Sequence, residues 1–149
     1  MFFEDLNSTS KVWTYTSDRI LTNEEVEQIQ SNANAFVKDW AAHGAGLEAR
    51  ALVYKNRFVI LAVDESNVNA SGCSIDSSVK FIKSAGNHFK IDFFKRTNMI
   101  VESESGELSD VHVSDLKNVH NAFVYNPMIT TLSQLRNEWL IPIAQSPFV

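Results

Sequence analysis

The chain has one cysteine, Cys73, among its 149 residues, so neither an intrachain disulfide nor a cysteine-cluster metal site can form. It also has no apolar run approaching the roughly 18 residues of a membrane-spanning helix. The N-terminus, Met1 to Asp5, lacks the basic and apolar regions of a secretory signal. A lone cysteine is typical of a reducing compartment. We therefore predict a cytoplasmic protein with no membrane association.

Several catalytic motifs are missing. The sequence contains no Gly-Lys dipeptide, which excludes a phosphate-binding P-loop, and no Gly-x-Ser-x-Gly, His-Glu-x-x-His or Cys-x-x-Cys pattern. Residues Gly44 to Ala49 match a dinucleotide-binding pattern, but they follow a predicted helix and enter a predicted strand, which is the wrong context. The histidines show no metal-ligand spacing that stands out. We predict neither a metal nor a cofactor.

Positive charge is in short supply. Thirteen lysines and arginines against 18 acidic residues give a net charge of -5, which argues against nucleic acid or an acidic membrane as a partner. The hydrophobic content of 44% is ordinary for a globular protein, and the length predicts a single domain over residues 1–149.

The first hundred residues alternate between strand and helix patterns. A capping box at Thr22 and Glu25 begins a helix with an apolar face, which the glycines at 44 and 46 end. A second helix begins near Ser74. Strands are expected at 12–17, 47–54, 57–64 and 99–102. Beyond them we expect a short helix from Ser114, a strand at 122–125, and a helix from Thr131 that includes Trp139 and ends at Pro142.

The order strand, helix, strand, strand, helix, strand is that of a ferredoxin-like βαββαβ fold, an α+β two-layer sandwich. Residues Phe58 to Val63 are apolar on both faces, so their strand should be central and covered on both sides. A ferredoxin-like sheet has one open face. We predict that residues 1–104 form the core and that a C-terminal extension, residues 105–149, covers that face, with a homodimer partner as the alternative cover.

This topology places the end of the first helix and the start of the second at one edge of the sheet. The same edge carries the end of the strand at 57–64. Two sets of candidate functional residues gather there. Cys73, His43 and Asp64 could act as a nucleophile, a base and an orienting group. The unpaired N–H groups of a helix start, where an anion can bind, are surrounded by Gly72, Ser74, Asp76 and Glu65. The alternative for Cys73 is a small buried residue, and the alternative for the others is that they form helix caps and solvated turns.

The sequence therefore leaves two functions open. The first is a non-catalytic binding or regulatory module for a small molecule, an anion or a protein partner. The second is a thiol-dependent enzyme or redox-sensitive protein that uses Cys73, whose thiolate a helix N-terminus would stabilise. Only the second requires Cys73 to be accessible and within reach of a histidine.

Two segments, residues 40–44 (Trp-Ala-Ala-His-Gly) and 70–79 (Ala-Ser-Gly-Cys-Ser-Ile-Asp-Ser-Ser-Val), resemble a family of small bacterial proteins of about 150 residues. Its members are often labelled "ABC transporter ATPase". The resemblance extends over nearly the whole chain, including Trp13 and the closing Trp139. It implies a bacterial protein but no catalytic residue, because the family has no established activity. The label does not match the residues, since the chain has neither the P-loop nor the length of a transporter ATPase.

Overall fold

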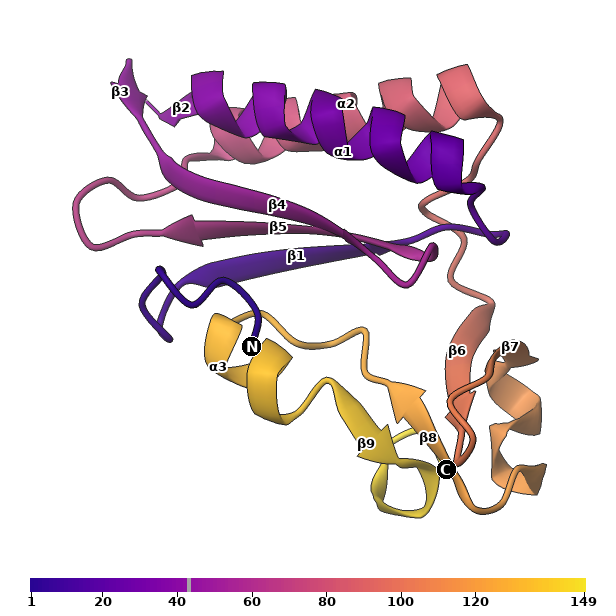
Figure 1. Ribbon diagram of the computed structural model, residues 1–149. Coiled ribbons are helices and arrows are strands. Elements are labelled where there is room, and N and C mark those ends of the chain that lie inside the picture. Colours follow the sequence, from indigo (N-terminus) through magenta and orange to yellow (C-terminus); the bar gives the residue numbers. More distant parts are fainter. Residues whose placement is uncertain (43) are drawn as a thin grey trace.

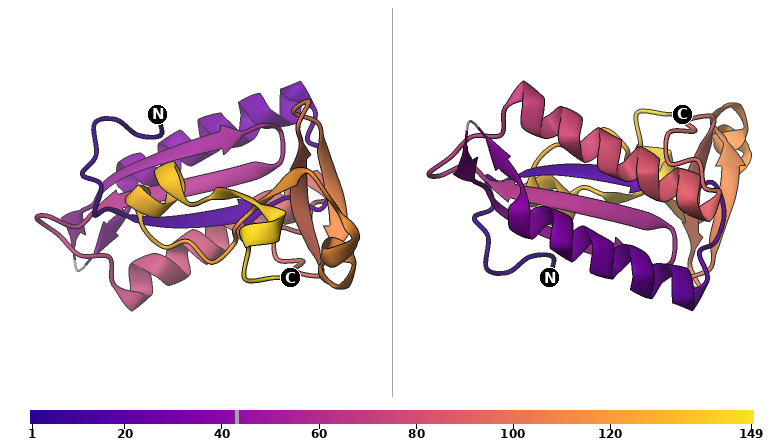
Figure 2. Two further views of the ribbon diagram at one scale, coloured as in Figure 1. Left: turned by 90° about the horizontal axis from the view of Figure 1, so that it is seen from below. Right: turned by 90° about the horizontal axis from the view of Figure 1, so that it is seen from above.

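The computed structural model describes residues 1–42 and 44–149 and is of the α+β class, with antiparallel sheets. The first sheet has the order β1-β5-β4, formed by Lys11–Thr16, Phe58–Asp64 and Glu48–Tyr54. Helices α1 (Asn23–Asp39) and α2 (Gly72–Phe89) run across one face of this sheet (Figures 1 and 2). None of the described helices is both long and apolar enough to cross a membrane.

The start of α1 is confirmed at the predicted capping box. The Glu25 N–H donates to the Thr22 hydroxyl at 3.1 Å, and the Thr22 N–H donates to the Glu25 carboxylate at 2.9 Å. The helix ends at Asp39, earlier than predicted, because the backbone of Trp40 is extended and its indole donates to the Ser74 carbonyl at 2.8 Å. A small hairpin of β2 (Ala41–Ala42) and β3 (Ala45–Gly46) follows.

Strand β5 is the centre of the first sheet. The turn before it places Lys55 and Asn56 at φ of 51° and 57°, the left-handed pair of a tight hairpin turn. Residues Phe58 to Val63 are all buried, as the doubly apolar pattern predicts. β5 pairs with β1 on one edge and with β4 on the other. Its two faces are covered by different parts of the chain.

The last strand of the expected βαββαβ fold lies elsewhere. Strand β6 (Asn98–Ser103) pairs with β7 (Leu108–His112) on one edge and β8 (Ala122–Tyr125) on the other. With β9 (Leu140–Pro142) they form a second sheet, in the order β7-β6-β8-β9. Both edges of β6 are therefore occupied, and none of the described strands continues the first sheet beyond β1. The expected four-stranded ferredoxin-like sheet is not formed, because β8 takes one edge of β6 and residues 108–112, an unpredicted strand, take the other.

The path from α2 to β6 depends on a close approach at the helix end. Lys90 takes the left-handed conformation at φ of 58°, and the Ile91 N–H donates to the Gly86 carbonyl at 2.8 Å. A Cβ on Gly86 would lie 2.5 Å from the Ile91 carbonyl oxygen, so only glycine fits. Residues 91–97 then leave the helical layer and lead into β6 (Figure 1).

The other face of the first sheet packs against residues far along the chain. α3 (Leu132–Asn137) begins at the predicted cap, Thr131, but ends before Trp139, and Pro142 belongs to β9 rather than to a helix end. The short 3-10 helices Val113–Asn118 and Ile143–Gln145 complete the C-terminal part. One buried cluster joins β1 and β5 to this part: Val12, Phe58, Ile60, Ala62, Ile100, Tyr125, Ile129, Leu132, Leu135 and Trp139.

A buried arginine joins the two sheets. Arg57, at the start of β5, is only 2% exposed and donates to both carboxylate oxygens of Asp110 on β7, at 3.1 and 2.7 Å. It also donates to the Ser17 carbonyl at 3.0 Å. Because the charge is paired and both terminal guanidinium nitrogens donate hydrogen bonds, the second sheet is oriented by a specific polar contact as well as by apolar packing. The buried Nε of Arg57 has no partner among the described residues.

We predict that Trp139→Ala lowers the free energy of unfolding by about 3–5 kcal/mol, the usual cost of truncating a large buried aromatic residue. The indole packs against Phe2, Tyr54, Phe58 and Tyr125 at ring separations of 4.6–5.7 Å. Chemical denaturation measures the change. Ile20→Ala, at a side chain that is 69% exposed, is the control and should cost under about 0.5 kcal/mol. Equal losses would contradict the packing.

Candidate functional site

The segment ends that the topology was expected to gather do lie at one end of the molecule, around β2 and β3 (Figure 1). α2 begins at Gly72, capped by Ser71, slightly earlier than predicted. Cys73 is in its first turn and is exposed, so the alternative of a buried cysteine is wrong. His43, the predicted base, lies outside the described residues.

The carboxylates at this end have other partners. Asp64 accepts from the Ser66 N–H at 2.9 Å and from the Ser66 hydroxyl, and these bonds lower its pKa. Glu65 pairs with Lys11 at 3.2 Å and accepts from the Ala70 N–H at 2.7 Å. Asp64 therefore holds its own loop, and Glu65 holds both that loop and the start of β1.

The helix-start residues are used in local structure as well. The Ser74 hydroxyl accepts from the Ser71 N–H at 2.6 Å and donates to the Ser71 carbonyl at 2.8 Å. Asp76 lies 3.6 Å from the Lys80 ammonium, and Gly72 has open space around it. Across residues 1–42 and 44–149, no hydrogen bond or ion pair reaches the Cys73 thiol, and no group of three or more potential metal ligands occurs. The predicted roles of Cys73, His43 and Asp64 stay predictions.

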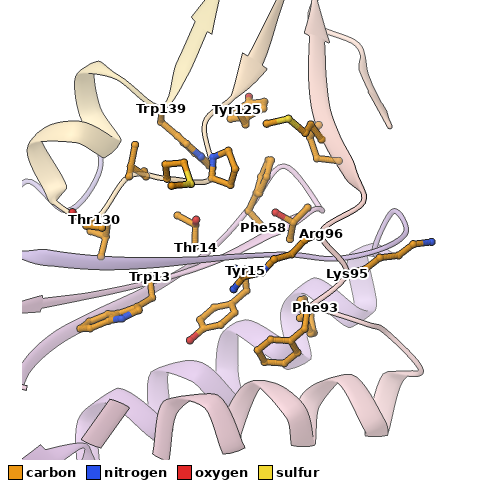
Figure 3. Close-up of a pocket in the computed structure, with 18 of the residues that line it drawn as sticks. Trp13, Thr14, Tyr15, Phe58, Phe93, Lys95, Arg96, Tyr125, Thr130 and Trp139 are labelled. Carbon is orange, nitrogen blue, oxygen red and sulfur yellow. The ribbon is translucent and has the colours of Figure 1, made fainter. Parts of the chain in front are cut away.

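A larger feature lies along the outer edge of β1. A cavity of about 720 Å³ opens there between the helical layer and the C-terminal part, within the size range of ligand sites (Figure 3). We call it the β1 groove. Its walls are mostly apolar and come from both sides of the strand edge: Ile75, Val79, Phe93 and Phe94 on the side of α2, and Phe58, Met99, Ile100, Tyr125, Ile129 and Trp139 on the other.

Alternate residues of β1 face opposite walls. In Figure 3 the side chains of Trp13 and Tyr15 point toward the helices, while Thr14 points toward Trp139. On the side of the second sheet, the hydroxyl of the lining residue Tyr125 donates to Glu102 at 2.7 Å. Burial and this bond raise the pKa of Tyr125, so its phenol is neutral and its proton is used in the hydrogen bond to Glu102. The polar character of the groove therefore comes from its rim and from the strand backbone.

The charges that line the groove are all positive. They are Lys11, Lys95 and Arg96, and none of the described residues in the lining is acidic. Lys11 is paired with Glu65, whereas no described carboxylate lies within ion-pair distance of Lys95 or Arg96. Arg96 extends toward Tyr15 in Figure 3. Burial raises the pKa of Tyr15, and the nearby Arg96 charge opposes that rise. The groove is a local positive site on an acidic protein.

The rim of the groove exposes apolar side chains. Met128 is 70% exposed and Val113 is 42% exposed, and both line the cavity. Exposed large apolar residues that border a concave site are typical of binding surfaces. Residue patterns along the chain did not predict this groove, because its lining comes from segments as distant as Lys11 and Phe148. The residue pattern that would have identified it, free cations beside apolar residues, is visible only after folding.

In comparisons with known proteins, no family model matches the chain, and no curated protein or solved structure matches it significantly. Membership of the bacterial family that the sequence resembles therefore stays a prediction. The functional argument depends on the geometry of the chain itself.

We predict that a maleimide reagent labels Cys73 completely in the folded protein, because the side chain is exposed. Mass spectrometry of the native protein measures the extent of labelling, and Cys73→Ser provides the unlabelled control. If labelling occurred only after addition of denaturant, the placement of Cys73 on the surface would be contradicted.

Proposed function

We propose that this protein is a non-catalytic binding module and that its ligand occupies the β1 groove. The observation that carries the proposal is the combination of a cavity of about 720 Å³, apolar walls, and two cations, Lys95 and Arg96, that no described carboxylate pairs. Apolar walls with a few placed polar groups are the usual composition of a ligand site.

The lining favours a ligand with an apolar body and an anionic group. The apolar part would contact the walls around Ile75 and Ile129, and the anion would approach Arg96. A guanidinium recognises carboxylate or phosphate through paired N–H donors, which would give the interaction direction as well as charge. A cationic ligand is disfavoured, because the groove is positive and lacks a described acidic residue.

The C-terminal part has a role in this proposal. Residues 105–149 would be an extension that, together with β6, covers the second face of the first sheet and supplies the far wall of the groove. The cluster that joins Val12 and Phe58 to Leu132 and Trp139 supports this role. We also propose, from the resemblance alone, that the chain belongs to the family of small bacterial proteins named above.

A thiol-dependent function remains the second candidate. The exposed position of Cys73 in the first turn of α2 favours it, since N–H groups at a helix start stabilise a thiolate. It requires a base beside the thiol, and the predicted base, His43, lies outside the described residues. The binding function needs no such additional group, and we therefore place it first.

The proposal predicts that the apolar anionic dye anilinonaphthalene sulfonate binds the folded protein and that Arg96→Ala weakens binding about fivefold. The loss corresponds to about 1 kcal/mol, the usual value of a partly exposed charge pair. Titration of dye fluorescence measures the dissociation constant. Raising the salt concentration should weaken binding to the parent protein more than to Arg96→Ala.

The matched control is Lys38→Ala, which removes one exposed positive charge at the end of α1, away from the groove lining. We expect this variant to bind the dye as the parent does. Absence of dye binding, or equal losses in Arg96→Ala and Lys38→Ala, would contradict the β1 groove as the ligand site.

A further inference from the structure

One edge of β1 carries unpaired backbone groups. In an antiparallel pair, alternate residues direct both N–H and C=O toward the partner, and the residues between direct theirs away. The Val12 N–H donates to the Thr130 carbonyl at 3.0 Å, on the side away from β5. The backbone N–H and C=O groups of the even-numbered residues of β1 therefore point away from β5 and into the groove. No hydrogen bond to a described residue uses the outward N–H or C=O of Thr14 or Thr16.

The chain itself begins to pair with this edge and then stops. Lys11 and Thr131 form an isolated antiparallel bridge, and the same register would place residue 128 opposite Thr14. The Met128 N–H instead donates to the Asn126 side chain at 2.9 Å, and Pro127 lies between them. This turn leads the chain away from β1, so the pairing ends at residue 130. What remains of the edge is open.

The open edge lies in a slot that fits a strand. The slot is the position beside β1 that the absent fourth strand of a ferredoxin-like sheet would have occupied. From Val12 to Thr16 it is about 13 Å long at ~3.3 Å per residue. It is walled by Ile75 and Val79 on one side and by Ile129 on the other. A strand placed there would be covered on both faces, as β5 is, and would therefore be apolar on both faces.

We propose that the occupant of the β1 groove is an extended peptide segment of a partner protein, added as a strand beside Thr14 and Thr16. The inference rests on the proposed binding function and names its ligand class. Exposed strand edges recognise peptides through main-chain hydrogen bonds, with side-chain pockets adding specificity. A compact amphiphile would fill the apolar space but would leave the alternating N–H and C=O groups without partners.

The charge at one end of the slot specifies the peptide further. Lys95 and Arg96 lie at the Tyr15 end of the strand in Figure 3, and neither is paired with a described carboxylate. The peptide should therefore carry consecutive apolar residues followed or preceded by acidic ones. A second copy of this chain is a poorer match, because its own open edge is bordered by the same positive charges.

The test uses two synthetic probes, acetyl-Thr-Val-Ile-Val-Glu-Asp-amide and its reversed sequence, because the strand direction is free. We expect one of them to bind and to slow hydrogen exchange at the Thr14 and Thr16 amides, measured by nuclear magnetic resonance. The Trp13 and Tyr15 amides, which face β5, should be slow with and without peptide. Replacing the two acidic residues of the peptide by lysine should weaken binding at least about fivefold.

Two matched changes isolate the backbone contribution. A fully N-methylated form of the same peptide keeps the side chains but has no N–H donors, and should bind at least about tenfold more weakly. Thr14→Pro removes the outward N–H of β1, a substitution that edge strands tolerate, and should have a similar effect. Thr14→Val keeps that N–H and should bind the peptide as the parent does.

The outcomes separate this inference from the proposed function. If the dye binds and responds to Arg96→Ala, but neither peptide protects the Thr14 and Thr16 amides, the strand-addition inference is overturned and the binding module stands. If the N-methylated peptide binds equally well, main-chain hydrogen bonding between the peptide and β1 is excluded, and the inference is overturned. Concentration-dependent protection of these amides without peptide would identify a second copy as the occupant and overturn the inference.

Discussion

The structure depends on one constraint, that β5 is apolar on both faces and has to be covered on both. Its residues from Phe58 to Val63 are all buried between two different layers. α1 and α2 cover one face, and the segment containing Leu132 and Trp139 covers the other. The second cover is organised around its own sheet, which Arg57 joins to the first through Asp110. Building that sheet recruits β6 and so removes it from the edge of β1.

The groove follows from this rearrangement. A four-stranded sheet would have satisfied the outward groups of Thr14 and Thr16 and filled the space between the layers. With β6 paired to β7 and β8, the space stays open at about 720 Å³. The turn at Asn126 to Met128 prevents the nearest segment from filling it. The arrangement that covers β5 therefore leaves a site shaped for a strand. Lys95 and Arg96, which pair with none of the described carboxylates, lie at its end and give it a preference for negative charge.

Local signals in the sequence predicted the elements well where the physical cause is local. The Thr22 capping box, the turn at Lys55 and Asn56, and the doubly buried β5 follow from nearest neighbours and periodicity. The topology beyond α2 was wrong because β7, from Leu108 to His112, has a weak strand pattern and competes for β6. Trp139 was wrongly assigned to a helix because its position depends on aromatic contacts with residues distant in sequence, which a local pattern does not reveal. The ends of α1 and β5 and the start of α2 lie at one end of the molecule, as expected. There Asp64 accepts from Ser66 and Glu65 pairs with Lys11, and the predicted roles of Cys73, His43 and Asp64 stay predictions.

The most direct test of this account is amide hydrogen exchange along β1 in the unliganded protein. An open edge requires an alternating pattern, in which the Trp13 and Tyr15 amides are protected by β5 and the Thr14 and Thr16 amides exchange much faster. Protection of the Val12 amide, which bonds to Thr130, provides the internal reference. Equal protection of all these residues would show that the edge is already paired in solution and would contradict the account.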